Sequence, residues 1–171
     1  FKLNSETAFG DTMLTVTNAG DFTGTGVEWS KLTVDRAALS DVSNLHGIQR
    51  IALMKRSNAA DTLKFQNYAA QEIGTATDTH EFGLVTDTDK DEANAALFEV
   101  SRFKDSEVVY SGTTEAYQGA SGSEIYGGLS RYGHTTTGNK LTVTGLKGAN
   151  DPKYAFGGIN KGATGDVKNN T

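Results

Sequence analysis

Short runs of alternating apolar and polar residues recur along this chain and are separated by polar turn residues. In each run Leu, Val, Ile or Phe occupies every second position, and the clearest runs lie at 12–17, 30–35, 50–54, 62–65 and 139–144. Alternation with a period of two predicts strands that bury one face and leave the other in water. We therefore predict a mainly β chain in which Leu and Val point inward and Thr points outward.

Two segments depart from this alternation and predict short helices. In the segment 87–100, acidic residues precede an Ala-rich stretch, an order typical of a helix N-terminus. In the segment 34–47, apolar residues fall at helical spacing and Gly47 provides a stop. The expected fold therefore includes one or two short helical insertions.

The C-terminal part of the chain contains one pattern twice, at an offset of 30 positions. Residues 125–141 and 155–171 share an aromatic residue followed by two glycines, then apolar, polar and basic residues, and later an asparagine. The matched positions are Tyr126, Gly127, Gly128 and Asn139 in the first copy and Phe156, Gly157, Gly158 and Asn169 in the second. Such a repeat is typical of units that stack because each alone cannot cover its apolar face.

Stacked coils would bring matched residues together. Tyr126 would lie near Phe156 and Asn139 near Asn169, which gives an aromatic column and an amide column. The glycine pairs would allow positive φ or a close approach between backbones. The alternative is an ordinary hairpin, in which the glycines form a turn or bulge and the asparagines cap turns.

The small and polar segment 111–123 is the expected boundary between two parts of the chain. We predict a less regular β-rich part at 1–118, a solenoid with insertions, and a repeated β-solenoid part at 119–171, together forming a single continuous domain. Leu141 of the first copy aligns with Thr171, so the second copy is interpreted as cut within its strand. An open strand edge at that end predicts self-association of the chain.

The repeated stretches resemble a known family. The sequences IYGGLSRYGHTTTGNKLTVTG, from Ile125, and AFGGINKGATGDVKNNT, from Ala155, are similar to the degenerate repeats of Gram-negative autotransporter and haemagglutinin-like adhesin passenger domains. The resemblance implies a right-handed parallel β-helix or related β-solenoid at the outer-membrane surface or outside the cell. It also implies a non-catalytic stalk or adhesive surface, with a glycan or protein on a host or neighbouring cell as partner. The charged residues between Asp87 and Asp105 depart from the family pattern.

A polysaccharide-active enzyme is the alternative function. Parallel β-helices also host lyases and glycoside hydrolases, and a fold alone does not determine function. Such an enzyme would gather carboxylates in one groove. The charged pairings to inspect are Asp35 with Arg36 and Arg102 with Asp105, each of which is otherwise a surface ion pair of little consequence.

Composition narrows the possible partners. The chain has 171 residues, with 16 Lys and Arg against 21 Asp and Glu, and its net charge of −5 disfavours nucleic acid. It contains no Cys, so neither a disulfide framework nor a thiolate metal site can form. No apolar run approaches the roughly 18 to 20 residues that span a bilayer, so we do not expect this part of the protein to cross a membrane.

Candidate metal ligands occur at Asp87, Asp89 and Asp91, whose spacing is that of a calcium loop. Glu92 stands where an EF-hand has glycine and Phe98 where it has glutamate, which argues against an EF-hand. A looser calcium site and a solvated acidic turn both remain open, and no other cofactor is expected.

Other residue types offer little chemistry. The histidines His46, His80 and His134 are scattered along the sequence and are expected at the surface or in turns. Trp29 and the tyrosines can stack on sugar rings, but aromatic residues belong as often to the core.

Overall fold

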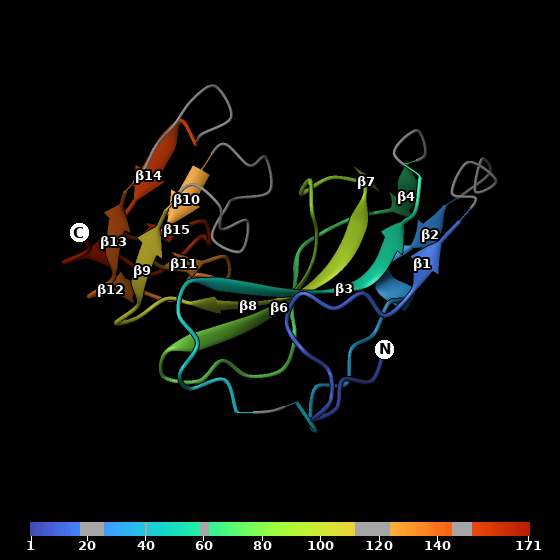
Figure 1. The fold of residues 1–171 in the computed structure, drawn as a ribbon, viewed down its shortest axis with the longest axis horizontal. Coiled ribbons are helices and arrows are strands. Elements are labelled where there is room, and N and C mark those ends of the chain that lie inside the picture. Colours follow the sequence, from blue (N-terminus) through green and yellow to red (C-terminus); the bar gives the residue numbers. More distant parts are fainter. Residues whose placement is uncertain (18–25, 40, 59–61, 112–123, 145–151) are drawn as a thin grey trace. The chain divides into compact units, whose positions relative to one another are not determined.

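The computed structural model describes residues 1–17, 26–39, 41–58, 62–111, 124–144 and 152–171 (Figure 1). The chain is mainly β, as predicted, and the helix found in the described residues is the short 3-10 turn Trp29–Lys31. The strands are β1 (Thr15–Val16), β2 (Val27–Glu28), β3 (Ile48–Arg56), β4 (Leu63–Gln66), β5 (Gln71–Glu72), β6 (His80–Thr86), β7 (Glu92–Ala93), β8 (Ala95–Arg102), β9 (Glu107–Tyr110), β10 (Glu124–Tyr126), β11 (Leu129–Ser130), β12 (Thr136–Thr137), β13 (Lys140–Val143), β14 (Tyr154–Phe156), β15 (Ile159–Asn160) and β16 (Val167–Lys168).

The chain forms two compact units, and it passes between them within β3, β6 and β8. The first unit comprises Phe1–Asp41, Arg50–Ile73 and Gly83–Glu99, and the second comprises Val42–Gln49, Gly74–Phe82 and Val100–Thr171. The boundary expected at 118/119 falls in 112–123, outside the described residues.

Two sheets contribute strands to the first unit. One has the strand order β1-β3-β8-β6-β5 and the other β2-β4-β7. Next to the smaller sheet, the buried ring of Trp29 packs edge-on against Phe65 and Tyr68, at centroid distances of 5.2 and 4.8 Å. The indole N–H of Trp29 donates to the carbonyl of Ala69 at 2.7 Å, so this aromatic cluster belongs to the core.

The two predicted helical insertions are absent from the described residues. Ala95–Arg102 is strand β8, which lies between β3 and β6 and is buried at every position except Arg102. A strand that is buried on both faces need not alternate apolar and polar residues. Its continuous apolar sequence therefore cannot be distinguished by pattern from that of a buried helix. In 34–47 the backbone forms single turns, Leu39 N–H to the carbonyl of Arg36 and Leu45 N–H to that of Val42.

Four of the five alternating runs coincide with or contain strands. Those at 50–54, 62–65 and 139–144 correspond to β3, β4 and β13, and the run at 12–17 contains the short β1. The run at 30–35 is wrong as a strand, because it begins in the 3-10 turn and forms only an isolated bridge between Lys2 and Asp35.

The second unit contains parallel strand pairs that join residues about one repeat apart. Tyr126 pairs with Phe156 and Leu129 with Ile159, both 30 residues later. Thr136 pairs with Val167, 31 residues later, and Val108 pairs with Leu141, 33 residues later. We call 103–110 the lower segment, 124–143 the middle coil and 154–171 the outer coil.

Apolar side chains of the middle and outer coils pack on one another. The rings of Tyr126 and Phe156 are stacked at a centroid distance of 5.9 Å, as the repeat predicts. Tyr126, Leu129 and Ile48 form a buried cluster against which Phe156 and Ile159 pack. The aromatic column expected from the sequence is therefore confirmed.

The amide column also forms, but with its register shifted by one residue. Asn139 Nδ2 donates to Asn170 Oδ1 at 2.7 Å, so the expected pairing of Asn139 with Asn169 is wrong. The outer coil has one more residue than the middle coil between the strands β11/β15 and β12/β16, since Ser130 and Thr136 match Asn160 and Val167. This extra residue changes the offset from 30 to 31.

Asn169 instead belongs to a column of left-handed residues. Asp105, Gly138 and Asn169 have φ of 53°, 69° and 50°. Gly138 and Asn169 immediately precede Asn139 and Asn170, and Asp105 immediately precedes Ser106, whose N–H donates to Asn139 Oδ1. Asn and Asp adopt this conformation more readily than other non-glycine residues. Gly, Asn and Asp can therefore each occupy this left-handed position. The role of Asn169 lies in its backbone conformation.

The glycine pairs permit close approach between the coils. A Cβ on Gly127 would lie within 3.0 Å of backbone atoms of Gly157 and Lys140, and one on Gly157 would lie 2.5 Å from the carbonyl oxygen of Thr171. A Cβ on Gly128 or Gly158 would collide with the amide of Asn139 or Asn170, respectively. Two equivalent positions thus need glycine for the same steric reason.

We expect Gly128→Val to lower the free energy of unfolding by about 1–3 kcal/mol, because it displaces the hydrogen-bonded amide of Asn139. Thr144→Val, at an exposed position, should change it by less than about 0.5 kcal/mol. Chemical denaturation of both variants measures the difference, and equal stabilities would contradict the close-approach argument.

The shifted register predicts a contrast among asparagines. Asn139→Ala removes the acceptor of Ser106 N–H and the donor to the carbonyl of Phe103, and should cost at least about 2 kcal/mol. Asn169→Gly should be neutral or slightly stabilising, because glycine adopts positive φ without strain. Thermal unfolding of the two variants decides between the registers, and a larger loss for Asn169→Gly would favour the unshifted pairing.

Candidate functional site

The buried carboxylate of Glu81 is the strongest candidate for functional chemistry in the described residues. It lies on β6, a strand whose every residue is buried, and Glu81 itself is 1% exposed. Its Oε2 accepts a hydrogen bond from Ser130 Oγ at 2.8 Å, and its Oε1 accepts one from the backbone N–H of Arg131 at 2.5 Å. Ser130 is the last residue of β11, and Arg131 begins the corner that follows this strand.

Burial raises the pKa of the Glu81 carboxyl from its usual 4.5 to about 7. Hydrogen bonds from the backbone of Arg131 and from Ser130, and the nearby His134, oppose this rise in pKa without cancelling it. The Nε2 atom of His134 lies 4.0 Å from Glu81 Oε2. The carboxyl therefore titrates near neutral pH, a property found at many functional sites.

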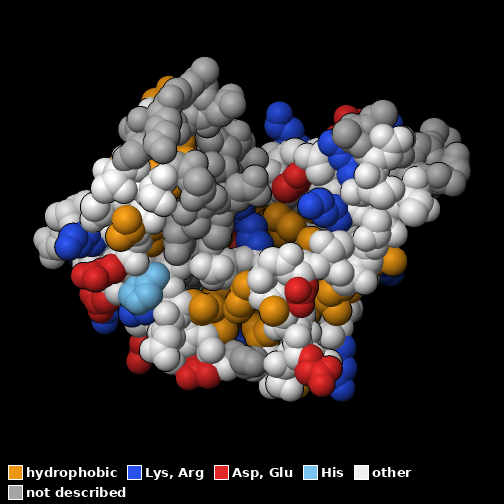
Figure 2. Space-filling view, viewed as in Figure 1, with side chains coloured by type: hydrophobic (Ala, Val, Ile, Leu, Met, Phe, Trp, Pro, Cys, Tyr) orange, Lys and Arg blue, Asp and Glu red, His pale blue; other side chains and the backbone are white. Residues whose placement is uncertain are grey.

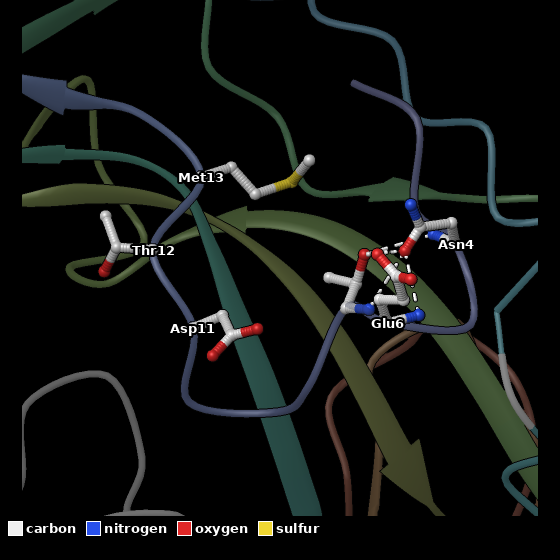
Figure 3. A pocket seen from close by; sticks show the side chains of 6 residues that line it. Asn4, Glu6, Asp11, Thr12 and Met13 are labelled. Atoms are coloured by element: carbon white, nitrogen blue, oxygen red, sulfur yellow. Dashed lines mark hydrogen bonds between the residues drawn. The ribbon is translucent and has the colours of Figure 1, made fainter.

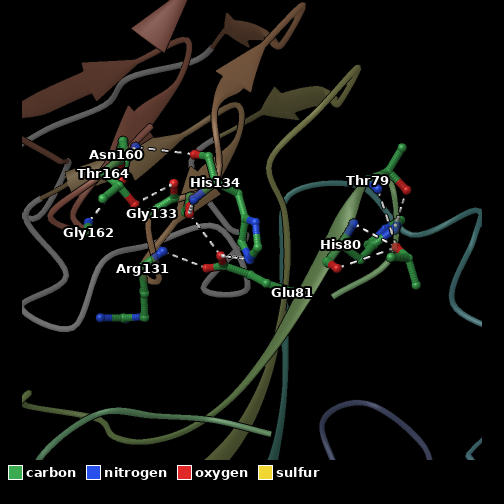
Figure 4. A network of polar contacts seen from close by, with 11 residues as sticks. Thr79, His80, Glu81, Arg131, Gly133, His134, Asn160, Gly162 and Thr164 are labelled. Carbon is green, nitrogen blue, oxygen red and sulfur yellow. Dashed lines mark hydrogen bonds and ion pairs between the residues drawn. The ribbon is translucent and has the colours of Figure 1, made fainter. Parts of the chain in front are cut away.

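The contacts around Glu81 continue to the outer coil (Figure 4). His134 N–H donates to Ser130 Oγ at 2.9 Å, and the His134 ring stacks on Phe103 at a centroid distance of 4.9 Å. Asn160 Nδ2 donates to the carbonyl of His134 at 3.2 Å, and Thr164 Oγ1 donates to that of Gly133 at 3.2 Å. A network that starts at Glu81 thus joins the residues that follow β11 to those at and after β15.

The geometry favours a positioning role for Glu81 over catalysis. The hydroxyl of Ser130 donates to Glu81 and accepts from the backbone of His134, so it is not poised against an imidazole as a nucleophile would be. A general acid must reach its substrate, whereas Glu81 is almost completely buried. In Figure 4 the side chain of Arg131 extends away from the carboxylate, and its backbone makes the contact.

The three candidate calcium ligands are engaged with the protein. Asp87 accepts hydrogen bonds from the backbone N–H groups of Asn94 and Ala95, and Asp91 accepts one from the N–H of Tyr68. Asp89 accepts one from the hydroxyl of Tyr68. In the described part of the chain, no group of three or more His, Cys, Asp or Glu side chains is arranged to hold a metal ion.

Residues of the two predicted charged pairings make contacts to backbone groups. Arg36 Nε donates to the carbonyl of Ile73, and Asp35 Oδ1 accepts from the N–H of Ala37. Arg102 donates to the carbonyls of Lys104, Ser43 and Leu45, and Asp105 lies in the left-handed corner. The contact of Asp35 is local, whereas the two arginines also join segments that are far apart in the sequence.

The histidines differ from one another. His80 is buried, against expectation, with Nδ1 2.8 Å from Thr79 Oγ1 and Nε2 2.9 Å from the carbonyl oxygen of Leu45. His46 Nδ1 accepts from the N–H of Glu107 at 2.9 Å. Among the three, only His134 approaches the candidate site.

A shallow pocket in the first unit is lined by Asn4, Glu6, Thr7, Asp11, Thr12 and Met13 (Figure 3). Asn4 Oδ1 accepts from the backbone of Glu6 and Thr7, so its amide organises the turn. All of these residues except Thr7 are exposed, and none of their chemistry points to a ligand.

The face of the molecule shown in Figure 2 has a mixed charge distribution. On the face shown in Figure 2, acidic and basic side chains are interspersed, with no broad patch of one sign. In the described ranges, no helix is long and apolar enough to cross a bilayer.

Comparison of the chain with protein-family models, with curated proteins and with solved structures finds no significant match.

Sequence patterns did not reveal Glu81. The segment HEFGLVT has neither strand alternation nor a metal-binding spacing, because His80 and Glu81 are not followed by the second His of a zinc-protease helix. The available signal was a single carboxylate directly before the apolar run 82–85, which implies either a partner or a raised pKa if that run is buried.

The raised pKa predicts that stability depends on pH. The folded carboxyl binds its proton more tightly than the unfolded one, so the native state holds more protons between pH 4.5 and about 7. The contribution to the free energy of unfolding is therefore fully present below pH 4.5 and is lost as pH rises through about 7, by an amount on the order of 3 kcal/mol.

Urea unfolding at a series of pH values measures this loss, and Glu81→Gln is the control. The Gln side chain still accepts from Arg131 N–H and can donate to Ser130 Oγ, but it has no carboxyl to titrate. The wild type should lose stability relative to the variant between pH 4.5 and 7. Parallel pH curves would refute the raised pKa.

Proposed function

We propose that this chain is part of a non-catalytic β-solenoid scaffold of the adhesin or autotransporter-passenger type, carried on the surface of a Gram-negative bacterium. The observation that supports this most directly is the parallel pairing of residues 30 to 33 positions apart in the second unit. A hairpin would pair neighbouring strands antiparallel, whereas parallel pairing at one-repeat spacing needs a coil between partners.

The columns along this part of the chain agree with the proposal. The rings of Tyr126 and Phe156 stack, and Ser106, Asn139 and Asn170 form a hydrogen-bonded column. Like-on-like stacking of aromatics and amides stabilises in-register parallel strands. Connections between parallel strands are right-handed in nearly all proteins, which favours a right-handed solenoid.

Outward residues supply the proposed binding face. Along the paired strands β9 and β13, Val109 lies beside Thr142 and Glu107 beside Lys140, and all four are exposed. A flat, polar surface with apolar positions between charges suits a glycan or an extended protein segment. The proposal places host, matrix or sister-cell ligands on such outward columns.

A polysaccharide-active enzyme is the less favoured function. The pKa of Glu81 fits an acid–base group, but its burial and its two hydrogen bonds leave no path to a sugar. An enzyme would therefore have to use residues other than this carboxylate.

Display of the chain on a non-adherent bacterium tests the proposal. We expect attachment to at least one of three surfaces, namely matrix protein, immobilised glycan or a layer of displaying cells. We also expect no release of reducing ends or unsaturated sugars from soluble polysaccharides. Gly128→Val, displayed at the same level, is the control for the intact coil. Attachment no greater than that of cells without the chain, or polysaccharide cleavage, would overturn the proposal.

A further inference from the structure

The carboxyl group of Glu81 lies between two elements that differ in how firmly they are held. On one side is β6, whose residues are all buried and which lies between β8 and β5 in the five-stranded sheet. On the other side is the corner 131–135, which joins the two-residue strands β11 and β12 and is half-buried at every position. Local opening starts where few contacts protect the backbone, so the corner is the element that can move.

Polar contacts connect this corner to β6 and to the outer coil. The N–H of Arg131 donates to Glu81, and the backbone of Tyr132 also stabilises the carboxylate form. From the outer coil, Asn160 Nδ2 donates to the carbonyl of His134, and the N–H of Asp166 donates to Thr135 Oγ1 at 3.2 Å. A movement of the corner away from β6 would therefore also loosen its contacts with the outer coil.

The charge that compensates an ionised Glu81 comes from His134. Its Nε2 lies 4.0 Å from Glu81 Oε2, but its side chain is 34% exposed, so water screens the attraction. The side chain of Arg131 extends away from the carboxylate (Figure 4). The other ionisable side chains on β6, β5 and β8 are engaged elsewhere or exposed, and these are His80, Glu99, Arg102 and Glu72. An ionised Glu81 is therefore a buried charge with weak compensation.

We propose that the corner 131–135 is a pH-sensitive switch, which is closed on β6 while Glu81 is protonated and opens locally when Glu81 ionises. Opening admits water to the carboxylate and leaves β6 in its sheet. The ionisation of one buried side chain thereby changes the surface of both the middle and the outer coil. This inference does not depend on an adhesive function.

The direction of the switch follows from the two environments of the carboxyl. In the closed structure burial raises the pKa of Glu81 from 4.5 to about 7, whereas water in the open structure restores the ordinary pKa. Below pH 4.5 the carboxyl is protonated in both forms and the corner stays closed. As the pH rises to about 7, opening releases a proton, and its equilibrium constant increases by up to roughly 300-fold.

Hydrogen exchange of single backbone amides, followed by NMR from about pH 5 to about pH 8, tests the switch. After correction for the intrinsic exchange rate at each pH, the N–H groups of Arg131 and His134 should lose protection at least tenfold. The N–H of Lys140, which donates to the carbonyl of Ser106 in the same unit, is the matched reference and should keep its protection.

Two variants separate the switch from a general effect of pH. In Glu81→Gln the protection of the corner should not change with pH, because the Gln side chain keeps the acceptor for Arg131 but does not ionise. In His134→Asn the loss of protection should extend to higher pH, because the charge of His134 lowers the pKa of Glu81. Thermal unfolding establishes that each variant folds.

Wild-type corner amides with constant protection across the pH series overturn the proposal. So does the same pH dependence in Glu81→Gln as in the wild type, since another group would then be responsible. An equal loss of protection at Lys140 also overturns the proposal, because this reports unfolding of the whole unit instead of opening of the corner.

Discussion

The second unit depends on one repeated hydrogen bond, in which a backbone N–H donates to the side-chain oxygen of the residue above it. Ser106 N–H donates to Asn139 Oδ1 at 3.0 Å, and Asn139 N–H donates to Asn170 Oδ1 at 3.0 Å. Below them, Gly47 N–H donates to Ser106 Oγ at 2.9 Å. These groups are largely removed from water, so each side chain satisfies a donor whose desolvation would otherwise be costly. The glycine pairs and left-handed corners provide the close approach that this column needs.

The same stacking explains why a carboxylate is buried at Glu81. The corners between β11 and β12 and between β15 and β16 lie off the regular strand pairs, so their backbone groups need other partners. Glu81 accepts from the corner of the middle coil, and Asn160 links that corner to the outer coil. The raised pKa of Glu81 is the electrostatic consequence of placing an acceptor there. Stability near neutral pH is thereby coupled to the geometry of the corners.

The sequence predicted those features of the fold that depend on repeats and on alternation in the sequence. The match of Tyr126 with Phe156 followed from two similar stretches, and the strands at 50–54 and 139–144 followed from alternation. Prediction from the sequence failed where the secondary structure depends on burial of both faces of a strand. The Ala-rich sequence of β8 resembles that of a helix, and its position between β3 and β6 explains why it forms a strand. Prediction from the sequence also misplaced Asn169 by one residue, because an insertion in a corner leaves the residue types similar while shifting the register. Glu81 could not be found from spacing, since its partners lie about 50 residues away.

The register of the coils is tested most directly by disulfide cross-linking, because the chain has no Cys of its own. Thr137 pairs with Lys168, while the unshifted repeat would pair it with Val167. Adjacent strand partners lie within the range that a disulfide spans. Under mild oxidation, the pair Thr137→Cys with Lys168→Cys should cross-link readily and Thr137→Cys with Val167→Cys slowly, as measured by peptide mass spectrometry. Equal rates, or a faster reaction of the second pair, would contradict the stacked arrangement described for these coils.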